Sequence, residues 1–212
     1  MFRIRAPLSL VATFVLIALV AAVFIGGGVV RDWKAKHGAS PSGEVNPPTL
    51  AQLEAIPLSL PILRAGDTCP DNPGVNSLGY DYGNGPVYFN GRLVPEIVSS
   101  WGYFYDLTYY SAPDLTGLVL VRGRDLRSER SIVFAGQYGA GAVVDTAGLE
   151  PLHRELVLNV GHPPLRDATT GYGIWYIRLG VSKGWSGCWG MQIENLDFRE
   201  TITGYSSPPA AP

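Results

Sequence analysis

The sequence has few of the side chains that most often carry catalytic or metal chemistry. Its 212 residues include only two cysteines, Cys69 and Cys188, and three histidines. A structural zinc site needs about four ligands, usually in closely spaced pairs such as C-x-x-C. No such pair occurs, because His153 and His162 stand nine positions apart and His37 is far from both. The sequence therefore predicts no zinc centre.

The motifs of phosphate-binding and nucleophilic sites are also missing. No glycine-rich loop follows a strand and opens a helix, as nucleotide binding requires. The string "GWSGC" (residues 184–188) approaches a nucleophile elbow, but it ends in cysteine and precedes a strand rather than a helix. The arginines of "RGRDLRSER" (residues 122–130) alternate with acidic residues, which favours ion pairs over a phosphate patch. We therefore predict no cofactor, and a non-enzymatic role is favoured over catalysis.

The chain also lacks an excess of positive charge. Its formal net charge is −2, and the part beyond residue 40 contains 11 Lys or Arg against 17 Asp or Glu. A protein that binds DNA or RNA needs basic side chains to neutralise the phosphates. The mildly acidic part beyond residue 40 therefore predicts no nucleic-acid partner.

One long hydrophobic run is present near the N-terminus. Residues 7–30 contain no charged side chain. As a helix they would span about 36 Å, against a hydrocarbon core of about 30 Å. The run is long for the apolar part of a signal peptide, and no clear A-x-A cleavage site follows it. We predict a single transmembrane helix with the lipid bilayer as its partner; a cleaved signal sequence is the alternative.

The rest of the chain divides by composition. Residues 1–6 are predicted to be cytoplasmic, and residues 31–65 are rich in Pro, Ser, Gly and Ala, as in a flexible stalk. Within that stalk, residues 50–55 are compatible with a short helical turn. Residues 66–205 are predicted to form the extracytoplasmic domain. Residues 206–212, "SSPPAAP", are expected to be a disordered tail.

The domain has the pattern of short β-strands throughout. Runs rich in β-branched and aromatic residues alternate with turn signals such as the glycines at residues 139–141. No window beyond the stalk sustains a helical period. We predict an all-β, Ig-like β-sandwich of about seven or eight strands, with a small barrel as the alternative. The runs are residues 86–89, 103–110, 117–123, 131–135, 155–160, 172–179, 188–193 and 198–203.

The two cysteines predict a disulfide. An even cysteine count in an exported chain favours Cys69–Cys188 over unpaired or reactive thiols. Closing a loop of 119 residues would contribute about 4 to 5 kcal/mol in the chain-entropy model. Cys188 alternates with Trp189, Met191 and Ile193, so we expect it to face away from the core. A disulfide also requires an oxidising compartment, which places the domain outside the cytoplasm.

The aromatic run "WGYFYDLTYY" (residues 101–110) is the best candidate for a contact surface. Its six aromatic side chains divide between the two faces of a strand, so one core cannot bury them all. Exposed Tyr and Trp rings suit sugars or protein partners. The alternative is a central strand buried on both faces. The candidate ligand contacts are Trp101, Tyr103, Tyr105 and Tyr109.

A calcium site is a weaker hypothesis. The segment "DTCPDNPGVNSLGYDYGNG" contains several oxygen-bearing side chains, of which Asp67, Asp71 and Asp81 are the candidates. The ligand spacing of an EF-hand is absent. Asp, Asn, Gly and Pro also make up any segment rich in turns. The segment is therefore expected to be structural.

Two motifs resemble those of a family of uncharacterised secreted or membrane-anchored bacterial proteins. "SGCWGMQIENLDFRETITG" is similar to the family's C-terminal signature, a Gly-Cys-aromatic strand followed by a turn and a Phe-bearing last strand. "SAPDLTGLVLVRGRDL" is similar to its middle motif. Ser186 stands where the family often has proline, and Asn195 lies in the turn where the family usually has a glycine. The resemblance implies an exported β-sandwich and names no site.

Together these observations predict a single-pass protein of the cell membrane whose C-terminal domain is extracytoplasmic. We expect a binding or interaction module of the cell envelope, with an envelope glycan or a surface protein as its partner. The alternatives are an envelope hydrolase acting on polysaccharide or peptide, and a structural spacer without a specific ligand. A hydrolase of the glycosidase kind would show two carboxylates about 5 to 9.5 Å apart in a pocket.

Overall fold

The computed structural model describes residues 47–74, 79–91, 97–98, 101–135, 139–144 and 152–206, with backbone alone at 97–98 and 139–144. These residues belong to the second of two compact units into which the chain divides, residues 47–212. Within the described ranges, no helix has the length and hydropathy needed to cross a membrane. The predicted cytoplasmic segment 1–6 and transmembrane segment 7–30 lie outside those ranges, as does the tail from residue 207 onward.

The described residues form one short helix and eleven strands. Helix α2 (Leu50–Glu54) falls where the sequence allowed a helical turn; Thr49 caps its N-terminus and Leu53 is buried. The strands are β1 (Val87–Asn90), β2 (Ile97–Val98), β3 (Gly102–Ser111), β4 (Leu118–Asp125), β5 (Val133–Ala135), β6 (Gly139–Val144), β7 (Leu152–Asn159), β8 (Leu165–Arg166), β9 (Gly173–Ser182), β10 (Cys188–Glu194) and β11 (Arg199–Tyr205).

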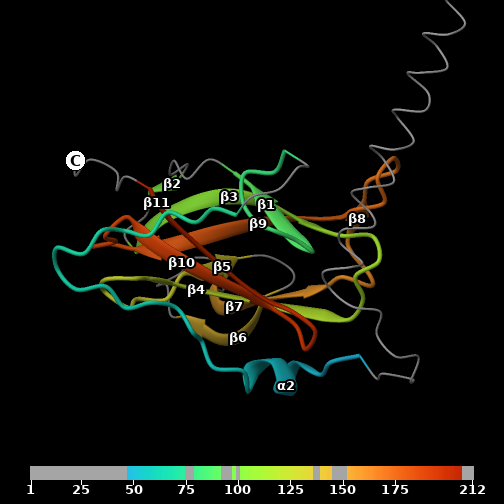
Figure 1. Cartoon of the computed structure of the whole chain (residues 1–212), viewed down its shortest axis with the longest axis horizontal. Coiled ribbons are helices and arrows are strands. Elements are labelled where there is room, and N and C mark those ends of the chain that lie inside the picture. The colour runs from blue at the N-terminus through green and yellow to red at the C-terminus, as the bar shows by residue number, and fades with distance from the viewer. Residues whose placement is uncertain are drawn as a thin grey trace, which may run out of the picture. The chain divides into compact units, whose positions relative to one another are not determined.

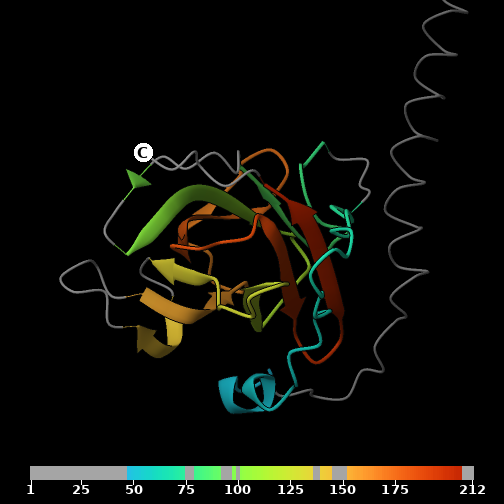
Figure 2. The ribbon, with the colours of Figure 1, turned by 90° about the vertical axis from the view of Figure 1, so that its left-hand side faces the viewer.

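All strands belong to one antiparallel sheet (Figure 1). The hydrogen-bonded path runs β1-β3-β9-β5-β7-β4-β10-β11, and β2, β6 and β8 pair with β3, β7 and β9 beside it. Figure 2 shows that this sheet is curled around its own interior. The all-β prediction is therefore confirmed. The two-sheet, Ig-like sandwich is not confirmed, because the strands follow one another in a single sheet.

A segment before β1 links the two edges of the curled sheet. Asn72 forms a β-bridge with Thr203 of β11, and Tyr82 forms one with Phe89 of β1. The N–H of Gly83 donates to the carbonyl of Pro73 at 2.8 Å, which joins the two halves of the segment. We call residues 72–74 and 79–84 the seam. The seam gives the edge strands β1 and β11 backbone partners that they would otherwise lack.

The interior of the curled sheet is a single apolar core to which every long strand contributes. In β10 the side chains of Trp189, Met191 and Ile193 belong to this core. Cys188 packs in a separate cluster on the outer side, so its predicted direction is confirmed. Close packing leaves little tolerance for change: a Cβ on Gly204 would lie 2.7 Å from the Trp189 ring.

The outer side of β4 and β10 is covered by residues 56–69, which we call the strap. None of its residues belongs to a strand, and hydrogen bonds hold its backbone against the sheet. The N–H of Leu63 donates to the carbonyl of Leu126 at 2.7 Å, and the N–H of Ser59 donates to Oε1 of Gln192 at 2.7 Å. Residues 47–65 were expected in the stalk; the structure instead packs them with the sheet, in the same compact unit.

Candidate functional site

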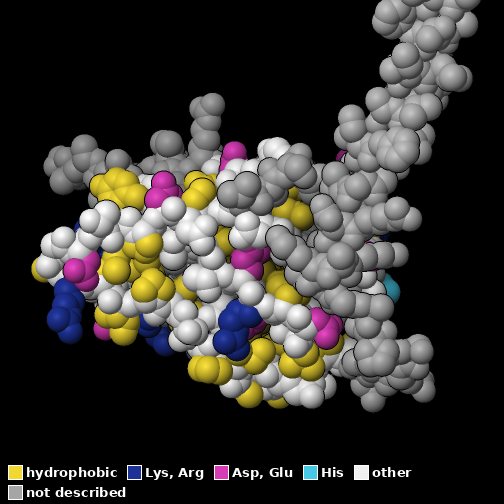
Figure 3. Space-filling model, viewed as in Figure 1, with side chains coloured by type: hydrophobic (Ala, Val, Ile, Leu, Met, Phe, Trp, Pro, Cys, Tyr) yellow, Lys and Arg dark blue, Asp and Glu magenta, His cyan; other side chains and the backbone are white. Residues whose placement is uncertain are grey.

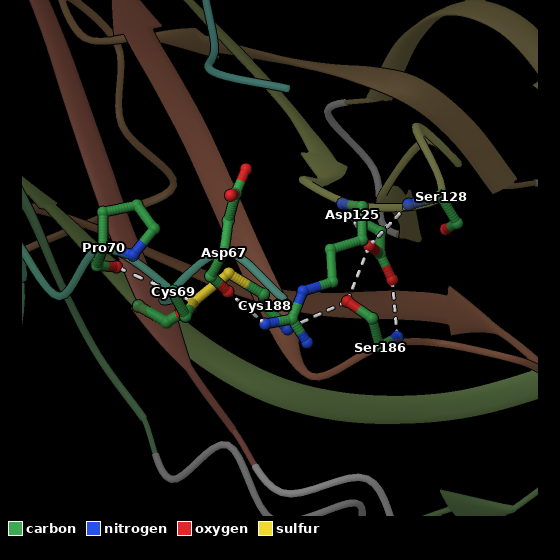
Figure 4. Close-up of a disulfide and its surroundings, with 9 residues drawn as sticks. Asp67, Cys69, Pro70, Asp125, Ser128, Ser186 and Cys188 are labelled. Atoms are coloured by element: carbon green, nitrogen blue, oxygen red, sulfur yellow. Dashed lines mark hydrogen bonds between the residues drawn. A yellow bond between two sulfur atoms is a disulfide. The ribbon is translucent and has the colours of Figure 1, made fainter. Parts of the chain in front are cut away.

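The disulfide joins the strap to the sheet. The Sγ atoms of Cys69 and Cys188 are bonded, with their Cα atoms 5.7 Å apart (Figure 4). Cys188 is fully buried, packed with Leu60 of the strap and with Leu126, the residue after β4. The sulfurs therefore lie outside the main core, beneath the strap. The predicted disulfide is confirmed, and neither cysteine is free for metal binding or nucleophilic chemistry.

A buried carboxylate secures the turns beside this disulfide. Oδ1 of Asp125 accepts from the N–H groups of Arg127 and Ser128, at 2.9 and 3.0 Å. Ser186 donates its N–H and its hydroxyl to the same carboxylate, at 2.6 and 2.8 Å (Figure 4). Burial opposes ionisation, but these hydrogen bonds outweigh it and lower the pKa of Asp125. Asp125 is thus a fixed structural anion.

A second buried carboxylate lies under the strap. Glu194 is fully buried and pairs with Arg122, while Arg199 Nε donates to it at 3.2 Å. The amide of Gln192 also donates to Glu194, at 2.7 Å, and to the carbonyl of Pro57, at 3.1 Å. Several donors thus satisfy this carboxylate, so we assign it a structural role.

Figure 3, seen from the strap side, shows acidic and basic side chains interspersed among hydrophobic ones.

The four predicted ligand contacts do not form a common surface. Tyr105 and Tyr109 are buried in the main core, 1% and 0% exposed, because their face of β3 lies on the inside of the curled sheet. Tyr103 is half-buried and packs against the same core. Trp101 packs beside Phe104 in a smaller cluster, with ring centroids 5.7 Å apart. Tyr105 and Tyr109 were predicted to contact a ligand; the structure corrects this, because both side chains are buried.

The opposite face of β3 carries the aromatic surface. Tyr110 pairs in register with Tyr88 of β1. The ring of Tyr80 lies over both, with centroids 4.6 Å from Tyr110 and 4.8 Å from Tyr88. Tyr172, just before β9, lies 6.0 Å from Tyr80. Together with Tyr176 of β9, these residues form what we call the tyrosine face, on the outer side of β1, β3 and β9.

The tyrosine face continues along β9 with exposed side chains. Tyr176 is 69% exposed, and Leu165 of β8, which pairs with Ile174, is 50% exposed. Further along the same strand, Arg178 Nε forms an exposed ion pair with Asp106 at 2.9 Å. Single exposed apolar side chains are common on protein surfaces, but contiguous ones mark interaction sites. This strip is the best candidate for a contact surface among the described residues.

The tyrosines are neutral phenols near carboxylates. Burial, with added contributions from neighbouring tyrosines and carboxylates, raises the pKa of Tyr80 and of Tyr88 to about 12. Burial first, and Asp114 second, raise the pKa of Tyr172. The charged groups that act on these rings are Asp167 for Tyr80, Glu200 for Tyr88 and Asp114 for Tyr172. Carboxyl groups therefore lie near three rings of the tyrosine face.

Glu200 is a functional candidate that sequence reasoning missed. It is 8% exposed; the N–H of Asn84, in the seam, donates to its Oε1. Its Oε2 is buried and has no hydrogen-bond partner among the described residues. Burial raises its pKa to about 7. A signal was available, because in "FRETIT" Glu200 alternates onto the same face as the core-facing Phe198 and Ile202.

The structure does not assemble the calcium candidates. Oδ2 of Asp67 accepts from the N–H of Arg64 at 2.7 Å, and Oδ2 of Asp81 accepts from the N–H of Gly91 at 3.1 Å. The Asp67 carboxylate therefore caps a local turn, whereas that of Asp81 joins the seam to the residue after β1; Asp71 is exposed beside the seam. In the part of the chain that the structure describes, no three His, Cys, Asp or Glu side chains are grouped to hold a metal ion.

Comparison of the chain with protein-family models, with curated proteins and with solved structures finds no match. The resemblance of the two sequence motifs to a bacterial family stays a prediction.

Proposed function

We propose that this chain is a binding module of the cell envelope, anchored by residues 7–30 in the membrane, with the tyrosine face as its contact surface. The observation that carries the proposal is the gathering of five tyrosine rings on the outer side of three neighbouring strands. The rings of Tyr80, Tyr110 and Tyr172 are only half-buried, and Tyr176 is mostly exposed.

Tyrosine suits such a surface for physical reasons. Its ring offers a large apolar area, its hydroxyl can form hydrogen bonds, and it has few rotatable bonds to immobilise on binding. The rings here are also supported by one another and by the sheet, which reduces that cost further. An envelope glycan or a surface protein is the class of ligand that we propose.

Two observations support the location. The Cys69–Cys188 disulfide fits an oxidising compartment, and the uncharged run at residues 7–30 fits a single membrane span. Together they favour a single-pass membrane protein with its C-terminal domain outside the cytoplasm.

An envelope hydrolase is the second candidate, and Glu200 is the observation that favours it. A carboxyl with a pKa of about 7 can act as a general acid or base at neutral pH. Burial of its Oε2, however, leaves that atom out of reach of a substrate in this conformation. A structural spacer without a ligand is the third reading, and it would be favoured by the failure of all binding tests.

The experiment compares tyrosines of the tyrosine face with a tyrosine on the edge strand β11. Full-length protein in detergent would be tested against envelope glycans and surface proteins, and the tightest ligand would be titrated against variants. Tyr176→Ala and Tyr80→Ala are each expected to weaken binding about tenfold, as removal of a central aromatic contact does. Tyr205→Ala is the matched control, because Tyr205 is 55% exposed on β11. Equal weakening by all three variants would argue against this surface.

A further inference from the structure

The tyrosine face has an acidic rim formed by two neighbouring loops. Asp114 follows β3, and Asp167 follows β8. The two loops touch, since a Cβ on Gly171 would lie 3.4 Å from the Cβ of Pro113. Tyr172 follows Gly171 directly; its carbonyl accepts from the N–H of Asp167 at 2.8 Å, and the charge of Asp114 acts on its ring. A positively charged ligand would be attracted to this end of the face.

The basic side chains nearby do not cancel this charge. Arg166 of β8 donates from Nη1 to the carbonyl of Gly171 at 2.7 Å, so it ties the loop of Asp167 together. Arg178 is paired with Asp106. Among the described residues, the rim therefore holds two carboxylates, Asp114 and Asp167, against the guanidinium of Arg166.

The orientation of the rings distinguishes between the two ligand classes. The ring planes are inclined to one another by 28° between Tyr80 and Tyr110, 31° between Tyr80 and Tyr88, and 47° between Tyr80 and Tyr172. The rings therefore share no common plane on which successive sugar rings could stack. Side chains of a peptide can approach separately the rings that are at least partly exposed, which excludes only the buried Tyr88, and a Lys or Arg side chain gains a cation–π contact as it does so.

We infer that the tyrosine face binds a basic segment of a partner protein, an extended stretch that places Lys or Arg side chains against the tyrosine rings and the carboxylates of Asp114 and Asp167. This inference rests on the proposed function and names the partner for the same surface. An extended peptide also fits the shape of the face, which follows β9 from Tyr172 to Tyr176, a distance of about 13 Å at 3.3 Å per residue.

The test uses matched probes. A short fluorescent peptide of alternating lysine and proline is held extended by its prolines; the same peptide with every lysine acetylated is its uncharged counterpart. A neutral oligosaccharide of N-acetylglucosamine is the third probe. Dissociation constants would be measured with full-length protein in detergent at low salt and at about 0.15 M salt, where exposed charges are screened beyond about 8 Å.

The charge variants are also matched. Asp167→Asn keeps the oxygen that accepts hydrogen bonds from Thr169 and Thr170, so its loop is preserved while the charge is removed. Asp114→Asn removes the second rim charge. Asp197→Asn makes the same change in the exposed turn between β10 and β11 and is the control.

The lysine peptide is expected to bind at least tenfold more tightly than the acetylated peptide, and to weaken at the higher salt concentration. Asp167→Asn and Asp114→Asn should each weaken it about threefold to tenfold, and Asp197→Asn should leave it unchanged. Equal binding of the two peptides, or equal effects of all three variants, would overturn the inference.

The outcomes separate this inference from the proposed function. One outcome is that the oligosaccharide binds the wild type, binds Tyr176→Ala more weakly and binds Asp167→Asn as tightly as the wild type. In that case the tyrosine face is a binding surface, but its ligand is not cationic. If neither peptide binds, the inference fails whatever the glycan does. If no probe, glycan or surface protein binds the face, the proposed function fails as well.

Discussion

The two outer sides of the curled sheet have opposite chemistry. On β4 and β10 the outward side chains are Arg122, Gln192 and Glu194, and the strap covers them. On β1, β3 and β9 the outward side chains include Tyr88, Tyr110 and Tyr176, of which Tyr176 is 69% exposed. Soluble proteins usually expose charges and cover apolar surface. The reversal indicates that the charges under the strap stabilise the fold, while the tyrosines remain available for contact.

The comparison separates stability from binding. Changes beneath the strap should lower the free energy of unfolding, because they leave charges or apolar surface uncompensated. Changes on the exposed part of the tyrosine face should alter affinity and leave stability nearly unchanged. Tyr176→Ala, at a mostly exposed side chain, should shift the free energy of unfolding by no more than about 0.5 kcal/mol.

The largest effect is expected from the disulfide. Replacing Cys69 and Cys188 together by alanine removes a cross-link that closes a loop of 119 residues. The free energy of unfolding should fall by about 4 kcal/mol, mainly because the unfolded chain gains entropy. Urea unfolding of the oxidised protein and the double variant would measure this. A decrease in the free energy of unfolding of less than about 1 kcal/mol would show that the other contacts of the strap are enough to hold it.

The second comparison sets a covered ion pair against an exposed one. Glu194→Gln should cost about 3 kcal/mol, since it leaves the charge of the nearly buried Arg122 without its closest partner. Asp106→Asn breaks the exposed pair with Arg178 and should cost no more than about 1 kcal/mol. Both values come from urea unfolding at pH 7. Similar costs for the two variants would contradict the difference between the faces.

The third effect depends on pH and concerns Glu200. Its pKa is about 7 in the folded protein, above the ordinary value of 4.5, so the folded state holds its proton more tightly than the unfolded state. The stabilisation from protonation is complete below pH 4.5 and is lost as the pH rises to 7. The change in the free energy of unfolding caused by Glu200→Gln should therefore be about 2 to 3 kcal/mol more stabilising at pH 8 than at pH 4.

Thermal or urea unfolding of wild type and Glu200→Gln from pH 4 to pH 8 would measure that difference. Glutamine keeps an oxygen that can accept from the N–H of Asn84, so the hydrogen bond to the seam survives the substitution. A difference between the two proteins that does not change with pH would show that Glu200 has an ordinary pKa.

Local sequence patterns predicted most of the strands and the disulfide. The run at residues 103–110 became β3, and the run at residues 188–193 became β10. These runs succeed because alternation of apolar and polar side chains is a local property. The glycines at residues 139–141 were interpreted as a turn, yet they begin β6. Glycine weakens a strand without excluding it, and pairing with β7 decides the outcome.

The features that the sequence did not reveal depend on contacts between distant segments. Alternation divided the aromatics of β3 into two faces but could not say which face lay inside, so Tyr105 was chosen and Tyr110 was not. The ring partner of Tyr110 is Tyr80 of the seam, and Tyr80 in turn lies near Tyr172, just before β9. The packing of the strap against the sheet was also not predictable, because its Pro-rich composition resembles that of a linker. Gln192, which accepts from the N–H of Ser59, lies 133 residues away from it.

The strap determines how the domain would respond to mechanical tension from the N-terminal side. Its attachments follow one another along the chain: Arg122 holds the carbonyl of Ile56, Arg124 that of Leu60, and Arg127 that of Asp67, before Cys69 is reached. A pulling force would therefore break these hydrogen bonds one after another. Detachment of the strap would then stop at the Cys69–Cys188 disulfide. Beyond it, the load passes directly into β10. The seam and Tyr80 lie past that point, so a tethered domain could be stretched while its tyrosine face stays assembled.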